Sequence, residues 1–92
     1  QSFAPDVYAL SEAYPNPFNN VTRLQYNLPA SGHVSITVND IAGRTVATLV
    51  NTNQQAGSHQ AVWDATSQSS GIYLLQMKAG DFTAVKKVML VK

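Results

Sequence analysis

Short runs with alternating apolar and polar residues are the feature that most limits the folds open to this chain of 92 residues. In "VSITVND" (34–40) every second residue is apolar, which is typical of a half-buried strand. Other β-prone runs are "VYAL" (7–10), "TRLQYNL" (22–28), "TVATLV" (45–50), "SHQAVWD" (58–64), "IYLLQMKA" (72–79) and "FTAVKKVMLV" (82–91). No stretch has a helical period. The pattern predicts an all-β fold, a seven-stranded antiparallel immunoglobulin-like β-sandwich.

Turn residues indicate how these runs pair. Gly43 supplies a position for positive φ and Asp40 a side chain that bonds turn N–H groups, so 34–40 and 45–50 are expected to form a hairpin. A second hairpin is expected across the "GD" between 72–79 and 82–91. The polar stretch "NTNQQAG" (51–57) is predicted to separate the first hairpin from the strand at 58–64.

The core can be assigned for some strands only. Trp63 shares a face with His59 and Ala61 at period two, and we expect it to be buried between two sheets. The segments "IYLL" and "VMLV" are apolar on both faces, so their periodicity leaves open which residues face the core.

The segment "YPNPFNN" (14–20) has the most unusual composition in the chain. Pro15 and Pro17 each fix φ and remove an N–H donor, and each biases the preceding residue away from helix. Asn16 can bond nearby backbone groups through its side chain, while Tyr14 and Phe18 carry apolar area. The segment is therefore predicted to be a stiff crossing held in place by its aromatic residues.

Charge and composition limit the possible partners. A net charge of +1 and a charged fraction of 12% argue against duplex DNA or an anionic membrane surface as a partner. The abundance of Ser, Thr, Asn and Gln is typical of an extracellular β-rich domain. The run Val88 to Val91 is too short to span a bilayer, and the start at Gln1 without a signal peptide leads us to expect a fragment or a processed piece.

No constellation of residues indicates chemistry. The chain has no Cys, and Asp40, Asp64 and Asp81 lie in or beside turns, where Asp normally bonds backbone N–H groups. His33 and His59 lack the local spacing of metal ligands. The "N-x-T" match at Asn20 is interpreted as a turn into the next strand. We therefore predict no catalytic residue, no metal, no cofactor and no small-molecule substrate.

Half of the six basic residues lie within the last seven positions, as Lys86, Lys87 and Lys92. Lysine at the edge of a sheet prevents pairing with foreign strands, so edge protection is one interpretation. Recognition of these lysines by a receptor is the other interpretation, and the residues themselves leave both open.

The order of motifs resembles the type A C-terminal sorting domain of the type IX secretion system. The resemblance runs from about Leu10 to Lys92 and rests on "YPNPF", "D-x-x-GR-x-V", "WD", "SG-x-Y" and a final "KK-x4-K". The chain departs from the family pattern at three positions, with Asn20 where the family often has Pro, Ala13 where it often has Asn, and Ala65 where Gly commonly follows "WD".

The resemblance implies a domain that works as a sorting signal. A fused N-terminal cargo protein would be directed through the outer membrane by a translocon, and a cell-surface sortase would cut the linker before the domain. The product would be secreted or held at the cell surface, reached through the periplasm and outer membrane of a Gram-negative bacterium. Residues 1–6 would be the linker remnant and 7–92 the sorting domain.

Carried over position by position, the resemblance also implies a set of recognition residues. These are Tyr14, Pro15, Asn16, Pro17, Phe18, Gly43, Arg44, Gly71, Tyr73, Lys87 and Lys92.

Two alternatives stay open at this point. Immunoglobulin-like domains of flagellar hook-capping proteins share much of the pattern and serve as assembly scaffolds. A carbohydrate-binding accessory module would need Trp63, or several Tyr side chains, exposed together on one face.

Overall fold

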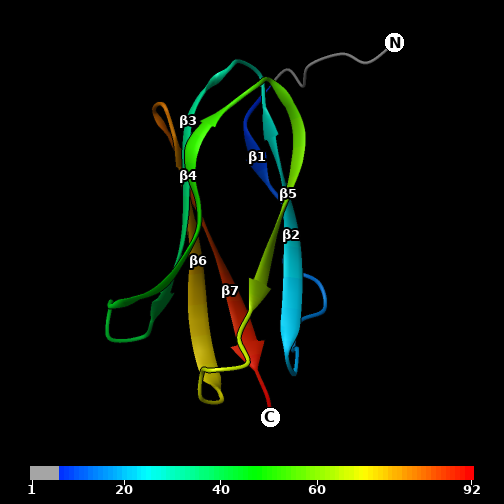
Figure 1. The fold of residues 1–92 in the computed structure, drawn as a ribbon, viewed down its shortest axis with the longest axis vertical. Coiled ribbons are helices and arrows are strands. Elements are labelled where there is room, and N and C mark those ends of the chain that lie inside the picture. Colours follow the sequence, from blue (N-terminus) through cyan, green and yellow to red (C-terminus); the bar gives the residue numbers. More distant parts are fainter. Residues whose placement is uncertain (1–6) are drawn as a thin grey trace.

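The computed structural model describes residues 7–92, which form seven strands in two antiparallel sheets (Figure 1). The strands are β1 (Ala9–Leu10), β2 (Val21–Leu28), β3 (Gly32–Asp40), β4 (Thr45–Gln54), β5 (Gly57–Asp64), β6 (Gly71–Ala79) and β7 (Phe82–Leu90). One sheet has the order β1-β2-β5 and the other β4-β3-β6-β7. The predicted all-β sandwich is therefore confirmed. The proposed linker remnant at 1–6 lies outside the described residues.

Both predicted hairpins form. In the turn between β3 and β4, the Asp40 carboxylate accepts hydrogen bonds from the N–H groups of Ala42 and Arg44, each at 3.0 Å. Gly43 has φ of 90° and Gly80, in the turn between β6 and β7, has φ of 58°. Few residues other than glycine adopt this left-handed region, so the two glycines allow the chain to reverse there.

The core lies between the sheets and consists of the inward residues of each strand. β2 contributes Leu24, Tyr26 and Leu28, which alternate with exposed or half-exposed neighbours. In β6 and β7, Tyr73, Leu75, Val88 and Leu90 are buried, whereas Ile72 and Met89 point outward and are 38% and 41% exposed. The structure thus shows which residues of β6 and β7 face the core, which the apolar sequence pattern of these strands left open.

Strand β4 is longer than the sequence pattern indicated. The prediction of a separating stretch at 51–57 is wrong for Asn51–Gln54, which pair with Ser35 back to Gly32 at the start of β3. The polar side chains of 51–53 are exposed, so the pairing comes from the backbone and from the length of β3 rather than from an apolar pattern. Only 55–56 connect β4 to β5.

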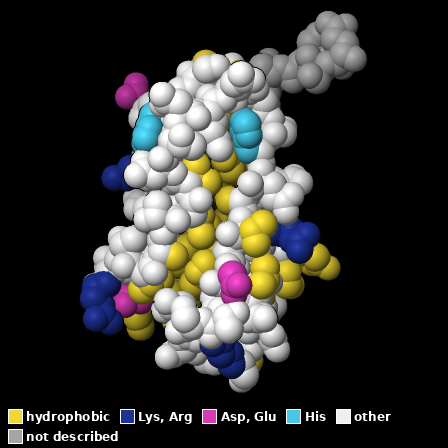
Figure 2. Space-filling model, viewed as in Figure 1, with side chains coloured by type: hydrophobic (Ala, Val, Ile, Leu, Met, Phe, Trp, Pro, Cys, Tyr) yellow, Lys and Arg dark blue, Asp and Glu magenta, His cyan; other side chains and the backbone are white. Residues whose placement is uncertain are grey.

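Two register shifts in the β3–β4 pairing explain the run "VATLV" in β4. They leave Val46 and Leu49 without a direct partner on β3, so two adjacent side chains can share one side of the strand. Val46, Ala47, Leu49 and Val50 are all half-buried and pack against the core. Figure 2, which has the same view as Figure 1, shows a strip of hydrophobic side chains along the middle of the molecule, between the two sheets.

Candidate recognition surface

The segment Tyr14–Phe18, which we call the crossing segment, joins the two sheets. Tyr14 pairs with Arg23 of β2 through two backbone hydrogen bonds of 2.7 and 3.0 Å. At its other end, the Phe18 N–H donates to the Met89 carbonyl at 2.9 Å, and the Val91 N–H donates to the Phe18 carbonyl at 2.8 Å. The segment therefore closes part of the outer edge of β7 and is pinned, as predicted. The expectation that both aromatic side chains hold it is wrong for Tyr14, whose ring is exposed and whose backbone makes the contact.

Asn16 fastens the middle of the crossing segment. Its Nδ2 donates to the Lys87 carbonyl at 3.1 Å, and its Oδ1 accepts from the Met89 N–H at 3.0 Å. The side-chain amide thus satisfies one donor and one acceptor of β7, as a neighbouring strand would. The Pro15 carbonyl accepts a 2.7 Å bond from Thr22 Oγ1, which attaches the segment to β2 as well. Both X–Pro bonds in the segment are cis.

Two of the predicted recognition residues are buried and support the fold. Phe18 is 3% exposed and lies against Trp63, with ring centroids 5.4 Å apart. Trp63, also 3% exposed, meets the ring of Tyr73 edge-on at 5.0 Å. The Tyr73 hydroxyl donates to the Ser69 carbonyl at 2.6 Å. These rings form an aromatic cluster in the core, so the prediction that Trp63 is buried is confirmed.

The remaining residues of the crossing segment are exposed, and Tyr14 is 77% exposed. A hollow of about 220 Å³ brings Asn16 and Pro17 together with Lys87, and Ile72 and Met89 complete its rim. The structure therefore places one predicted lysine next to the crossing segment, although 70 positions separate Pro17 and Lys87 in the chain.

A second hollow, of about 360 Å³, lies on the outer face of the three-stranded sheet. Tyr14 lines it together with Arg23, Gln25 and Gln60. Neither Arg23 nor Gln60 was predicted as a site residue. Alternation places both on an outer face, but nothing in the sequence shows that Tyr14 pairs with Arg23 or that β5 lies beside β2.

The other predicted residues lie around one end of the sandwich. Gly43 and Arg44 belong to the β3–β4 turn, Gly71 begins β6, and Lys92 follows β7. Figure 1 shows the β3–β4 turn, the loop before β6 and the C-terminal end of β7 in the lower part of the molecule, away from the end marked N. Gly43 and Arg44 are not lining residues of either hollow beside the crossing segment.

Two turn carboxylates near this end are held in their ionised form. Hydrogen bonds from the Arg44 N–H, together with its side chain and charge, lower the pKa of Asp40. Arg44 Nε lies 3.1 Å from Asp40 Oδ2. Hydrogen bonds from the side chain and N–H of Thr66 lower the pKa of Asp64, and the charge of Lys92 acts in the same direction. The predicted turn bonds of Asp40 and Asp64 are therefore present.

The lysines at the end of β7 differ in what they contact. Lys86 forms an ion pair with Glu12, with 3.0 Å between Nζ and Oε2. Lys92 Nζ donates to the Thr66 carbonyl. Lys87 has an exposed side chain, and its carbonyl accepts a hydrogen bond from Asn16. Since the crossing segment already bonds this part of the β7 edge, edge protection explains Lys87 less well than it would on an open edge.

The titratable residues that could support metal binding lie apart. No group of three or more His, Asp or Glu within residues 7–92 is placed to hold a metal ion. His33 Nε2 lies 2.8 Å from Asn51 Oδ1, and His59 Nε2 lies 2.7 Å from the Gln55 carbonyl. Figure 2 shows the two histidine side chains on opposite sides of one face of the molecule.

Among residues 7–92, the structure contains no helix with the length and hydrophobicity needed to cross a membrane.

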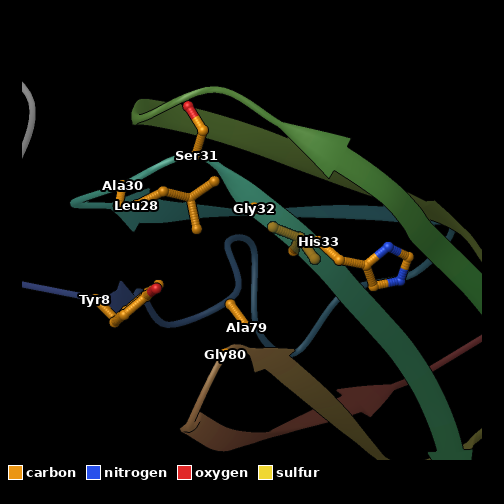
Figure 3. Close-up of a pocket in the computed structure, with 9 residues that line it drawn as sticks. Tyr8, Leu28, Ala30, Ser31, Gly32, His33, Ala79 and Gly80 are labelled. Carbon is orange, nitrogen blue, oxygen red and sulfur yellow. The ribbon is translucent and has the colours of Figure 1, made fainter.

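The opposite end of the sandwich contains a hollow of about 230 Å³ where the described chain begins (Figure 3). Tyr8 lines it from one side, while Ala30 and Ser31 line it from the β2–β3 turn. The Tyr8 ring stacks on Phe82, with centroids 5.3 Å apart. A Cβ at Gly80 would lie 3.3 Å from the Tyr8 hydroxyl, so glycine leaves room for this ring.

Comparison with known families gives one match. The model of the family described as "Secretion system C-terminal sorting domain" matches residues 12–92. No curated protein matches the chain. The match covers most of the chain and favours the sorting interpretation over the scaffold. The carbohydrate-binding alternative is also disfavoured, because Trp63, Tyr26 and Tyr73 are all buried.

Proposed function

The chain belongs to the family of C-terminal sorting domains of the type IX secretion system, and we propose that it directs a fused cargo through the outer membrane by means of the crossing segment and the exposed lysine beside it. The family membership makes the domain a sorting signal, which implies export to the cell surface or secretion by a Gram-negative bacterium. Sorting signals of this kind are typically not catalysts.

The observation that carries the proposal is the rigid fastening of the crossing segment. Backbone bonds hold it at Tyr14 and Phe18, and the Asn16 amide holds it between them. A surface that is already ordered loses little conformational entropy on binding, so a preformed segment suits recognition of a folded signal. Tyr14, Asn16, Pro17 and Lys87 are the exposed residues that a partner would contact.

The buried residues and the turn residues of the motifs have a different role in this proposal. Phe18 and Tyr73 hold the segment and the loop before β6 in place, and Gly43, Arg44 and Gly71 shape the turns. The partners would be the outer-membrane translocon, which reads the exposed surface, and a cell-surface sortase, which cuts before the domain. The proposed domain division is a linker remnant at 1–6 and a sorting domain at 7–92, and the proposed route passes through the periplasm.

A fusion experiment tests the proposal. The chain is placed at the C-terminus of a passenger with its own inner-membrane export signal, and the passenger is followed in a type IX host. We expect the passenger in the medium or on the surface, and we expect it in the periplasm when the chain is absent. Retention of the intact fusion in the periplasm, in a host that exports its own cargo, would show that the sorting proposal is wrong.

A further inference from the structure

The hollow of about 360 Å³ beside Tyr14 has the size and lining of a binding site. Ligand pockets commonly measure roughly 300–1,000 Å³ and combine apolar surface with a few polar groups. Tyr14 and Arg23 line this hollow with Ser11, Glu12, Gln25 and Gln60. The two glutamines are direct neighbours, because Gln25 pairs with Gln60 across β2 and β5. Their amides can donate to and accept from the main chain of a bound peptide.

Sheet register aligns three exposed side chains next to the hollow. Tyr14 pairs with Arg23, and Arg23 pairs with Val62 on β5. Neighbouring strands are about 4.8 Å apart, so the row is roughly 10 Å wide. Tyr14 is 77% exposed and Val62 is 52% exposed. Tyr and Arg are among the residues enriched at protein–protein interfaces, where they often carry much of the binding energy.

The charge of Arg23 in the hollow favours an anionic partner. Glu12 is compensated by Lys86, whose Nζ lies 3.0 Å from Oε2. Arg23 has no ion-pair partner within residues 7–92, so its positive charge is left over. A guanidinium can bind a carboxylate through two parallel hydrogen bonds, which gives Arg an advantage over Lys at such a site.

We infer that this hollow binds an acidic peptide segment of a partner protein. A carboxylate of the peptide is bound by Arg23, and an adjacent apolar side chain packs on the ring of Tyr14 and on Val62. A peptide fits better than an isolated anion, because the exposed row and the paired glutamines extend the surface beyond the guanidinium. The inference rests on the proposed function only in assigning the partner to the export machinery.

The binding itself can be tested on the 92-residue chain in solution. The probe is an acetylated and amidated Glu-Phe-Glu tripeptide, and its Gln-Phe-Gln counterpart lacks the charge. In an amide NMR titration we expect shifts confined to residues around Tyr14, Arg23 and Gln60, with the neutral peptide about tenfold weaker. Added salt should weaken the acidic peptide and leave the neutral one unaffected. Equal binding of both peptides, or no localised shift at millimolar peptide, overturns the inference.

Matched variants separate the site from general charge. Arg23→Gln should weaken the acidic peptide about five- to tenfold, whereas Arg23→Lys should retain part of the affinity. Lys78→Gln is the control, because Lys78 is exposed on β6 and does not line this hollow. Tyr14→Ala should weaken both peptides, since it removes the apolar contact. An equal effect of Arg23→Gln and Lys78→Gln would show that only the net charge matters, and the site would be refuted.

The passenger fusion then tests the identity of the partner. Arg23→Gln should lower delivery severalfold, and Lys78→Gln should leave it unchanged. If Arg23→Gln is delivered like the parent, the partner is not part of the export machinery and that assignment is overturned. If the parent fusion is not delivered while the isolated chain binds the acidic peptide, the sorting proposal fails and the binding inference holds.

Discussion

Residues of the same motif contribute to the domain in different ways. Phe18 and Trp63 act through burial in the aromatic cluster, whereas Asn16 is exposed and acts through its amide. Burial of a large side chain stabilises a fold by several kcal/mol more than an exposed hydrogen bond does. Substitutions at Trp63 and at Asn16 should therefore differ clearly in their effect on the free energy of unfolding.

Trp63→Ala should lower the free energy of unfolding by about 3–5 kcal/mol, because it removes the ring that joins Phe18 to Tyr73 in the core. Chemical denaturation of the isolated chain measures the change. Val62→Ala, at the adjacent exposed position, should change stability by less than about 1 kcal/mol. Similar losses in the two variants would contradict the assignment of Trp63 to the core.

Asn16→Ala should lower the free energy of unfolding by about 1–2 kcal/mol, since it removes two hydrogen bonds to the β7 backbone. Hydrogen exchange should show faster exchange at the Met89 N–H, which donates to Asn16 Oδ1. Asn19→Ala serves as the control, because Asn19 is exposed in the same loop. An unchanged Met89 exchange rate would mean that the amide does not fasten the segment in solution.

At the scale of elements, the sequence predicted which segments are strands better than it predicted how they pair. All seven strands were expected near their observed positions, because alternation and turn glycines are local signals. Asn51–Gln54 was missed, since a polar edge strand has no apolar pattern and is formed by pairing with β3. The bonds between Asn16 and β7 were also beyond prediction, because they join residues more than 70 positions apart.

The candidate surface was predictable only in part for the same reason. The resemblance selected Tyr14 and Lys87, but the neighbours that give them a shape, Arg23, Gln60 and Met89, follow from the packing of sheets. The resemblance also could not separate buried from exposed members of the motif. Phe18 and Tyr73 are buried in the core, whereas Tyr14 and Asn16 are exposed, although Tyr14, Asn16 and Phe18 are spaced two residues apart.

The β3–β4 turn and the loop after β5 should make the fold sensitive to acid. The pKa values of Asp40 and Asp64 are lowered by hydrogen bonds in the folded state. Each carboxylate therefore contributes stability above its unfolded pKa of about 3.9, and this contribution is lost as the pH falls through the lower folded pKa. The denaturation midpoint should drop as the pH falls below about 4.

An Asp40→Asn/Asp64→Asn variant should lose less stability than the parent over the same acid range, because neither side chain can then titrate. Denaturation curves at neutral and acid pH measure the difference. Parallel losses in the parent and the variant would show that other groups determine the acid response.

At the scale of the whole molecule, the two outer edges of the larger sheet are protected from foreign strands in different ways. The crossing segment bonds Met89 of β7 and Val91 just after it, and Asn16 also bonds the Lys87 carbonyl. At the other edge, β4 has no charged residue and no proline, and its two register shifts are the devices that make it a poor template for foreign strands. The proposed recognition surface thus lies on the edge that the chain itself closes.

This arrangement determines how the role of the last residues can be tested. Removing 86–92 deletes Val88 and Leu90, which are 0% and 1% exposed, and it also deletes the partners of Asn16 and Phe18. The truncated chain should fail to fold, so a loss of delivery would not distinguish recognition from misfolding. Only substitutions that preserve β7 can answer the question.

Lys87→Gln/Lys92→Gln removes two charges and keeps the apolar residues of β7 in place. Stability should change by less than about 1 kcal/mol, because the Lys87 side chain is exposed and Lys92 loses one exposed bond to the Thr66 carbonyl. If these charges belong to the recognition surface, the passenger should remain in the periplasm although the domain is folded. Lys78→Gln, which changes an exposed lysine on β6, should be delivered like the parent and controls for net charge. Delivery of the double variant at the parental level would remove the lysines from the recognition surface, and Tyr14 and Asn16 would then be the residues through which the translocon reads the domain.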